Sequence, residues 1–225
     1  MNNTFNTSPV IGLFGCRSPI IVDYSETCLR LKQQVFGIAI VEGNRCNHTL
    51  EVVSIESYSA SEFRHSILPC AFGPRRRKKL WQLAEELECR LSETLVDPTS
   101  ILPSNLRVGL GGFINAGTVV GAESFLGDGV LINRSSSVGH HNLIGNWVSI
   151  GPGATLCGNV HVADLATIGA GATILPDIRI GEGSVIAAGT VVRDHVSSHT
   201  LVAGNPARPM KYDVAKGALN LIGEE

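Results

Sequence analysis

Residues 108–192, divided into groups of six, read VGLGGF INAGTV VGAESF LGDGVL INRSSS VGHHNL IGNWVS IGPGAT LCGNVH VADLAT IGAGAT ILPDIR IGEGSV IAAGTV V. Each group begins with an aliphatic residue, which gives fifteen aliphatic positions from Val108 to Val192 without one insertion. Amphipathic helices repeat every 3.6 residues and half-buried strands every two, so neither explains a period of six. The segment is therefore a hexapeptide repeat.

This repeat predicts a left-handed parallel β-helix of triangular cross-section. The aliphatic residue points inward, and we expect the glycine or asparagine that follows it to adopt a positive φ in the turn. Three groups form one coil, so fifteen groups form about five coils, with a height of ~24 Å at a strand spacing of ~4.8 Å. The composition agrees, because 17 of the 25 glycines lie in residues 108–192, where only seven residues are charged.

The preceding residues follow a different pattern, which predicts a small Rossmann-like α/β domain at 1–100. Strands are expected at 8–15, 35–44 and 65–73, and helices at 20–34 and 74–91. This alternation is typical of a parallel sheet. The predicted fold is thus mainly β: the α/β domain, the β-helix at 101–200 and a C-terminal extension at 201–225. In that extension the turn-rich segment AGNPARP is expected to leave the last coil and cross its surface.

Composition excludes several classes of protein. The net charge of −2 gives no general attraction to nucleic acid or to an anionic membrane. No apolar run approaches the ~18 residues of a membrane span, and the polar start MNNTFNTSP does not resemble a secretory signal. The six cysteines form no CxxC pair, which favours free thiols in a reducing cytoplasm. We expect no metal, since no histidine or cysteine spacing matches a known metal pattern.

Two polar segments of the α/β domain are candidates for ligand contact. Residues Gly15 to Pro19 fall between an expected strand and helix, where such domains hold anionic ligands, although a plain structural turn is the alternative. The basic run from Arg75 to Lys79 offers charge for a phosphate or carboxylate, or forms a solvated helix face.

The chemistry of the β-helix is expected at two adjacent histidines. His140 and His141 take the third and fourth places of their group of six, which point away from the core. A histidine there can accept a proton from an amine or hydroxyl that attacks an acyl donor. The alternatives are two ordinary surface histidines, or a metal site completed by His161, His195 or His199.

Residues 108–210 resemble the hexapeptide-repeat acyltransferases. The segment INRSSSVGHHNLIGNWVSIGPGATLCGNV and the closing VAGNPARP are similar to sugar acetyltransferases of the sialic acid and bacillosamine pathways, the NeuD/PglD type. This resemblance implies a homotrimer with active sites at the subunit interfaces, and acetyl-CoA between adjacent prisms. His140 falls on the family's catalytic histidine. Positions that line the acetyl-CoA groove correspond to Ser149, Ala170 and Ala188.

The same resemblance implies that a nucleotide-linked sugar is held mainly by the α/β domain. The expected substrate-binding residues are Gly15, Cys16, Arg17, Ser18, Gly73 and Asn133. The chain departs from the family at two places, because CRSP replaces its glycine-rich loop and His141 replaces the acidic residue that usually follows the catalytic histidine. Glu123, one coil earlier, or an acid from another subunit is expected to substitute for it.

The implied reaction is acetyl-CoA-dependent N-acetylation of a nucleotide-linked sugar for surface glycan. His140 acts as the general base while the amine attacks the thioester directly, because Cys157 lies more than two groups away at a turn and is expected to be structural. One alternative is O-acetylation of a sugar hydroxyl. Another is a hexapeptide-repeat protein without catalysis, and a carbonic anhydrase would need three histidines converging on zinc.

Overall fold

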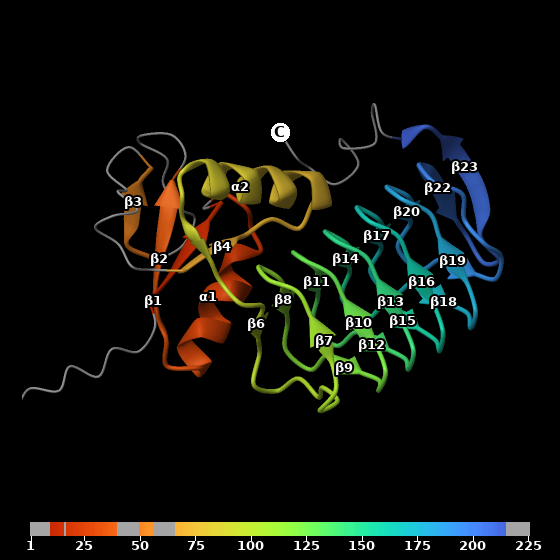
Figure 1. Ribbon diagram of the computed structural model, residues 1–225. Helices are drawn as coiled ribbons and strands as arrows, with labels where there is room; N and C mark the ends of the chain where they lie inside the picture. Colours follow the sequence, from red (N-terminus) through yellow and green to blue (C-terminus); the bar gives the residue numbers. More distant parts are fainter. Residues whose placement is uncertain (1–9, 16, 40–49, 56–65, 215–225) are drawn as a thin grey trace, which may run out of the picture.

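The computed structural model describes residues 10–15, 17–39, 50–55 and 66–214, which form two parts (Figure 1). The first part is a parallel five-stranded sheet with the order β3-β2-β1-β4-β5. Its elements are β1 (Val10–Phe14), α1 (Ile21–Arg30), β2 (Gln34–Ala39), β3 (Val52–Ser54), β4 (Ser66–Pro69), α2 (Pro74–Glu86) and β5 (Arg90–Leu91). Strands and helices alternate as expected, and the short strands β3 and β5 were not predicted.

The second part is a parallel β-solenoid with three sheets. The groove face contains β7 (Arg107–Val108), β10 (Phe125–Leu126), β13 (Leu143–Ile144), β16 (His161–Val162) and β19 (Arg179–Ile180). The open face contains β9 (Val119–Val120), β12 (Ser137–Val138), β15 (Thr155–Leu156), β18 (Thr173–Ile174) and β21 (Val191–Val192). The covered face contains β6 (Leu95–Val96), β8 (Phe113–Ile114), β11 (Leu131–Ile132), β14 (Ser149–Ile150), β17 (Thr167–Ile168), β20 (Val185–Ile186), β22 (Thr200–Ala203) and β23 (Arg208–Tyr212).

Three corners join these faces. The histidine corner leads from the open to the groove face and includes residues 139–142 and 157–160. The alanine corner leads from the covered to the open face and includes 133–136, 151–154, 169–172 and 187–190. The acidic corner leads from the groove to the covered face and includes 127–130 and 145–148.

From Ile114 to Val192 the aliphatic residue of each group of six faces the interior, as predicted, whereas Val108 in β7 is 41% exposed. Leu126 and Ile144 pair across adjacent coils, 18 residues apart, and both are fully buried. The core of the solenoid is therefore a column of stacked aliphatic side chains, and removing this apolar surface from water stabilises the coil. Eighteen residues per coil confirm that three groups of six form one coil.

The prediction that the residue directly after the aliphatic one adopts a positive φ is wrong. Positive values occur at the third residue after the aliphatic one, as at His141 (58°) and Trp147 (61°). Glycine directly after the aliphatic residue is required by close contact between coils. A Cβ on Gly121 would lie 2.6 Å from the backbone N of His140 in the next coil. Glycine at this place lets successive coils approach each other.

The solenoid extends beyond the predicted five coils at both ends. Strand β6 pairs with β8 before the first complete coil, and β22 pairs with β20 after the last. The prediction that the segment AGNPARP leaves the last coil is only partly right, because its first residue, Ala203, ends β22. The chain then turns back, and β23 pairs antiparallel with β22. The end of the tail, residues 215–225, lies outside the described residues.

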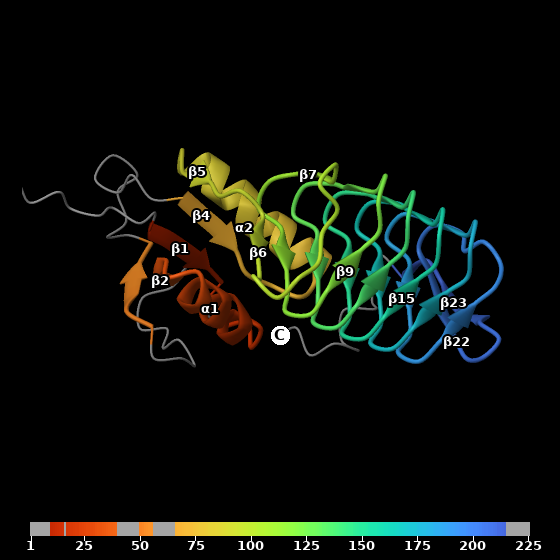
Figure 2. The same cartoon turned by 90° about the horizontal axis from the view of Figure 1, so that it is seen from below.

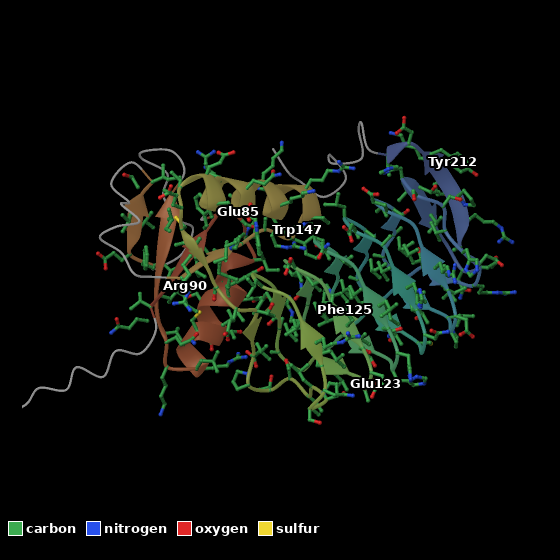
Figure 3. The ribbon with its side chains drawn as sticks, in the orientation of Figure 1. Glu85, Arg90, Glu123, Phe125, Trp147 and Tyr212 are labelled. Carbon is green, nitrogen blue, oxygen red and sulfur yellow. The ribbon has the colours of Figure 1, made fainter. Side chains whose placement is uncertain are left out.

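The α/β part packs against the first coils of the covered face (Figure 2). Tyr24 of α1 stacks on Phe113 of β8, with ring centroids 4.0 Å apart. Trp81 of α2 meets Trp147 of the acidic corner edge-on at 4.8 Å, and Figure 3 shows Trp147 beside α2. These buried contacts fix the position of the α/β domain relative to the histidine and alanine corners.

Candidate active site

His140 and His141 lie in the exposed turn between β12 and β13, at the histidine corner. Their Nδ1 atoms are 2.9 Å apart, and the two rings are perpendicular. The turn is anchored from both sides, because the His141 amide donates to Ala122 O at 3.0 Å and His140 O accepts from the Asn159 amide at 2.9 Å. The backbone therefore holds both imidazoles at the surface, where one can exchange a proton with a bound substrate.

Asn142 fixes the end of this turn from inside. Its side chain is fully buried, donates from Nδ2 to Gly139 O at 3.0 Å, and accepts at Oδ1 from the Val160 amide at 2.6 Å. Because Asn142 forms hydrogen bonds with backbone groups of two coils, it restrains the turn that carries the histidines. This residue was not identified from the sequence, where an asparagine at a turn has no special signal.

Gly158 lies one coil above His140 and borders its ring. A Cβ at Gly158 would stand 2.7 Å from Cε1 and 2.8 Å from Nε2 of His140. Any side chain larger than hydrogen would thus occupy the space of the imidazole. The sequence pattern alone treats this glycine as one more turn residue.

The predicted cofactor residues lie elsewhere on the solenoid. Ala170 and Ala188 are exposed and stack one coil apart on the alanine corner. The open face separates this corner from the histidine corner, so one chain does not bring them to His140. Ser149 is fully buried, where its Oγ donates to Phe72 O at 2.5 Å and accepts from Arg77 at 3.0 Å. The structure thus places the Ser149 side chain between the two domains.

An open groove of about 670 Å³ runs along the groove face. Its walls include the apolar Phe125 and Leu143 near the coil of His140, and His161, Arg179 and His195 further along. Leu143 follows the histidine corner in the chain, and the walls continue through Gly145, on the side of the acidic corner. Mostly apolar walls with the guanidinium of Arg179 suit an elongated molecule with an anionic end.

The expected substrate turns do meet in the α/β domain. Gly15 follows β1 with a φ of 120°, and a Cβ there would collide with Cys70 O after β4, so the two strand ends touch. The Ser18 amide donates to Gly15 O at 2.9 Å, which closes a turn before α1. Gly73 is buried and precedes α2. Arg17 is exposed beside this turn, and Cys16 lies outside the described residues.

Asn133 belongs to a polar cluster where α1 meets the alanine corner. Its Oδ1 accepts from Asn115 Nδ2 at 2.9 Å, and Asn115 Nδ2 also donates to Asp23 at 2.9 Å. Asp23 pairs with Arg134 at 2.8 Å, with the Arg134 side chain 59% exposed. The cluster joins the first turn of α1 to the alanine corner. Asp23 and Arg134 were not identified from the sequence, because only the fold brings them together.

Glu123, the expected substitute for the family's acidic residue, lies one coil before His141. Its carboxylate accepts from Asn105 Nδ2 at 2.6 Å. Figure 3 shows Glu123 at the outer edge of the solenoid. Within the described residues, the hydrogen-bond partner seen for the His140 ring is His141.

Comparison with known proteins agrees with this architecture. Residues 159–194 match the family model described as bacterial transferase hexapeptide (six repeats). The acetyltransferase domain of PglB from Neisseria gonorrhoeae, solved in complex with acetyl coenzyme A, is 26% identical, with a TM-score of 0.82 over 90% of this chain and 100% of that one. The resemblance to the hexapeptide-repeat sugar acetyltransferases is confirmed.

Two further structures share this fold. PerB from Caulobacter crescentus, in complex with CoA and GDP-perosamine, is 23% identical, with a TM-score of 0.82 over 91% of this chain and 98% of that one. WeeI from Acinetobacter baumannii is 25% identical, with a TM-score of 0.75 over 89% of this chain and 99% of that one. No curated protein sequence matches the chain.

One basic residue of α2 stabilises the acetyltransferase fold from within. Arg77 is fully buried, whereas the run from Arg75 to Lys79 was expected to meet a ligand or solvent. Its guanidinium donates to backbone carbonyls of both domains and to one hydroxyl: Ala71 O, Phe72 O, Gly129 O, Trp147 O, Val148 O and Ser149 Oγ. Arg77 therefore links the loop before Gly73 to the acidic corner.

Tyr24 is the other notable titratable group at this domain junction. Burial raises its pKa well above the ordinary value, and the nearby Cys70 and Asp23 act in the same direction, against the opposite effect of Arg77. The hydroxyl is buried and has no hydrogen-bond partner among the described residues. Tyr24 is therefore a neutral packing residue, stacked on Phe113.

The described residues contain no group of three or more His, Cys, Asp or Glu side chains arranged to hold a metal ion. Across the same ranges, no helix is both long and apolar enough to cross a membrane.

Proposed function

We propose that the protein is an acetyl-CoA-dependent N-acetyltransferase that acts on an amino group of a nucleotide-linked sugar for surface glycan. The observation that carries this proposal is the exposed His140 imidazole at the turn between β12 and β13, in a fold shared with the PglB domain that binds acetyl coenzyme A. The match spans both domains, so it includes the substrate turns as well as the solenoid.

The proposed reaction needs one base and no covalent intermediate on the protein. His140 Nε2 accepts a proton from the amine as the nitrogen attacks the thioester carbonyl. The tetrahedral intermediate then collapses, the C–S bond breaks, and CoA leaves as a thiolate that takes up a proton. The products are the acetamido sugar and CoA. Cys157 is not needed as a nucleophile and belongs to the turn before Gly158.

The proposed active site contains two copies of the chain within a homotrimer. His140 and the alanines at 170 and 188 lie on different corners, so a second copy is needed to bring an alanine corner to the histidine corner. Exposed apolar side chains on the two faces beside the histidine corner support such packing: Val119, Phe125 and Leu143 are 37–42% exposed. The groove that Phe125 and Leu143 line is proposed to receive the pantetheine arm of acetyl-CoA, with Ala170 and Ala188 of the second copy on its other side.

The sugar nucleotide is proposed to occupy the strand ends of the α/β domain. Gly15, Arg17, Ser18 and Gly73 lie there, at the edge where parallel sheets hold nucleotides. Asn133 is proposed to face the sugar from the alanine corner. The reaction is proposed to take place in the cytoplasm, where acetyl-CoA is made and where the thiols of Cys28 and Cys157 are stable.

The test is a spectrophotometric assay of CoA release with a panel of amino and hydroxy sugar nucleotides, followed by mass spectrometry of the products. The proposal predicts turnover with an amino sugar and a mass increase of one acetyl group on nitrogen. Turnover with hydroxy sugars alone would instead support an O-acetyltransferase. The absence of both turnover and acetyl-CoA binding in calorimetry would indicate a structural or binding protein.

A further inference from the structure

The contact between the two imidazoles restricts where protons can sit. With the Nδ1 atoms 2.9 Å apart, one hydrogen lies between them, so one ring donates and the other accepts. If neutral His140 donates from Nδ1, its Nε2 carries no hydrogen and can accept a proton from the substrate. If His141 donates, Nε2 of neutral His140 carries the hydrogen and is no base.

Gly158 restricts the same ring by shape. The space that a Cβ at Gly158 would fill is taken by Cε1, Nε2 and Nδ1 of His140, at 2.7, 2.8 and 3.3 Å. The ring therefore rests against the glycine α-carbon. A methyl group there would push the ring outward and separate the two Nδ1 atoms, but His140 is exposed and can move without disturbing the core.

We infer that His141 and Gly158 are positioning residues, which together hold His140 with its Nδ1 donating to His141 and its Nε2 free as the base. In this arrangement Nδ1 of His141 accepts the hydrogen that Nδ1 of His140 donates. The inference rests on the proposed role of His140 in acetyl transfer.

Other titratable groups near the pair are engaged elsewhere. Glu123, one coil earlier, accepts from Asn105 Nδ2, and Asp177, two coils later, accepts from Asn159 Nδ2 at 2.7 Å. Cys157 is half-buried in the adjoining coil and makes a backbone hydrogen bond to the following coil. In the described part of the chain, neither carboxylate is seen bonded to the two imidazoles.

Substitutions at position 141 test the hydrogen bond. His141 has a φ of 58°, which glycine and asparagine adopt readily, so neither replacement strains the backbone. His141→Gly removes the acceptor and is expected to lower kcat about tenfold, the value of one hydrogen bond, with an unchanged KM for acetyl-CoA. His141→Asn restores an acceptor oxygen and is expected to recover most of this loss.

The pH profile separates a positioning role from a merely structural one. His141→Asp supplies a carboxylate, which favours the protonated form of His140, so the acidic limb of kcat/KM is expected to move up by about one pH unit. A profile that is identical in the wild type and in all three variants would overturn the role of His141.

Gly158→Ala tests the space that His140 occupies. The variant is expected to lower kcat at least about tenfold with a small change in melting temperature, because only an exposed ring moves. Gly117→Ala is the control: its Cβ would have no neighbour within 3.4 Å, and its φ of 69° lowers the stability of the variant without affecting the His140 ring. A Gly158→Ala enzyme as active as this control would refute the role of Gly158.

Nitrogen-15 NMR of histidine-labelled protein gives a readout that does not depend on turnover. The inference predicts His140 as the Nδ1–H tautomer in the wild type, and a shift of its resonances in Gly158→Ala. A dominant Nε2–H tautomer of His140 would overturn the inference even if the enzyme is active. If the wild type transfers no acetyl group, the proposed function fails, and this measurement still decides the arrangement of the pair.

Discussion

Replacing Arg77 with methionine is expected to destabilise the protein by at least about 3 kcal/mol. The side chain is fully buried and bonded to five carbonyls and one hydroxyl across both domains. Two of the carbonyls keep another donor, because Val148 O also accepts from the Leu131 amide and Phe72 O from the Ser149 hydroxyl.

For the other three carbonyls, Arg77 is the hydrogen-bond donor that the structure shows, and the substitution removes it. These carbonyls are Ala71 O, Gly129 O and Trp147 O. A buried carbonyl without a partner costs about 1–3 kcal/mol, so the lower limit for three is about 3 kcal/mol. For a chain of this length, that loss lowers the melting temperature by roughly 6–12 °C. Methionine keeps similar volume and apolar contact, so the change measures the polar contacts of the guanidinium.

The assay is urea unfolding followed by tryptophan fluorescence, because Trp81 and Trp147 meet at the domain junction. Lys79→Met, an exposed substitution on the same helix, is the control and is expected to change stability by less than about 0.5 kcal/mol. If Arg77→Met costs no more than this control, the six hydrogen bonds do not hold the two domains together, and the account of the junction is refuted.

Three other predictions follow from named groups. Burial alone would raise the pKa of Asp97, but hydrogen bonds from Thr99, Thr27 and Arg30 hold it below its ordinary value. Its stabilising effect is therefore present above the unfolded-state pKa and lost as the pH falls through the lower folded-state pKa; Asp97→Asn should flatten the acid limb of a stability–pH curve. Burial raises the pKa of Cys28 to about 12, so iodoacetamide at pH 8 should leave it unmodified in the native protein and label it in urea. Sedimentation equilibrium should give three times the mass of one chain, and a monomer at micromolar concentration would contradict the proposed two-copy site.

The sequence was sufficient to predict the solenoid because its period is local. The groups of six repeat an aliphatic residue and turn residues, so the aliphatic positions from Ile114 to Val192 specify the core without knowledge of distant contacts. The same pattern led to the wrong position for the residues with positive φ. The glycine after the aliphatic residue is required by contact with the next coil and not by a turn with positive φ. That requirement, seen at Gly121 against His140, depends on how coils stack.

The candidate site was predictable in part. His140 and His141 stood out because they occupy outward places of the repeat, and the structure confirms that both are exposed. The surroundings of Ser149 and Arg77 could not be derived from the sequence, since the two side chains meet across 72 positions. Gly158 was missed for a related reason, because its neighbour is the ring of His140, one coil away.

The role of His140 as the base for acetyl transfer is tested by kcat/KM of His140→Ala with acetyl-CoA and an amino sugar nucleotide that the wild type accepts. We expect a decrease of at least ~100-fold, with acetyl-CoA affinity and melting temperature close to those of the wild type. A variant with a near-normal rate would contradict it.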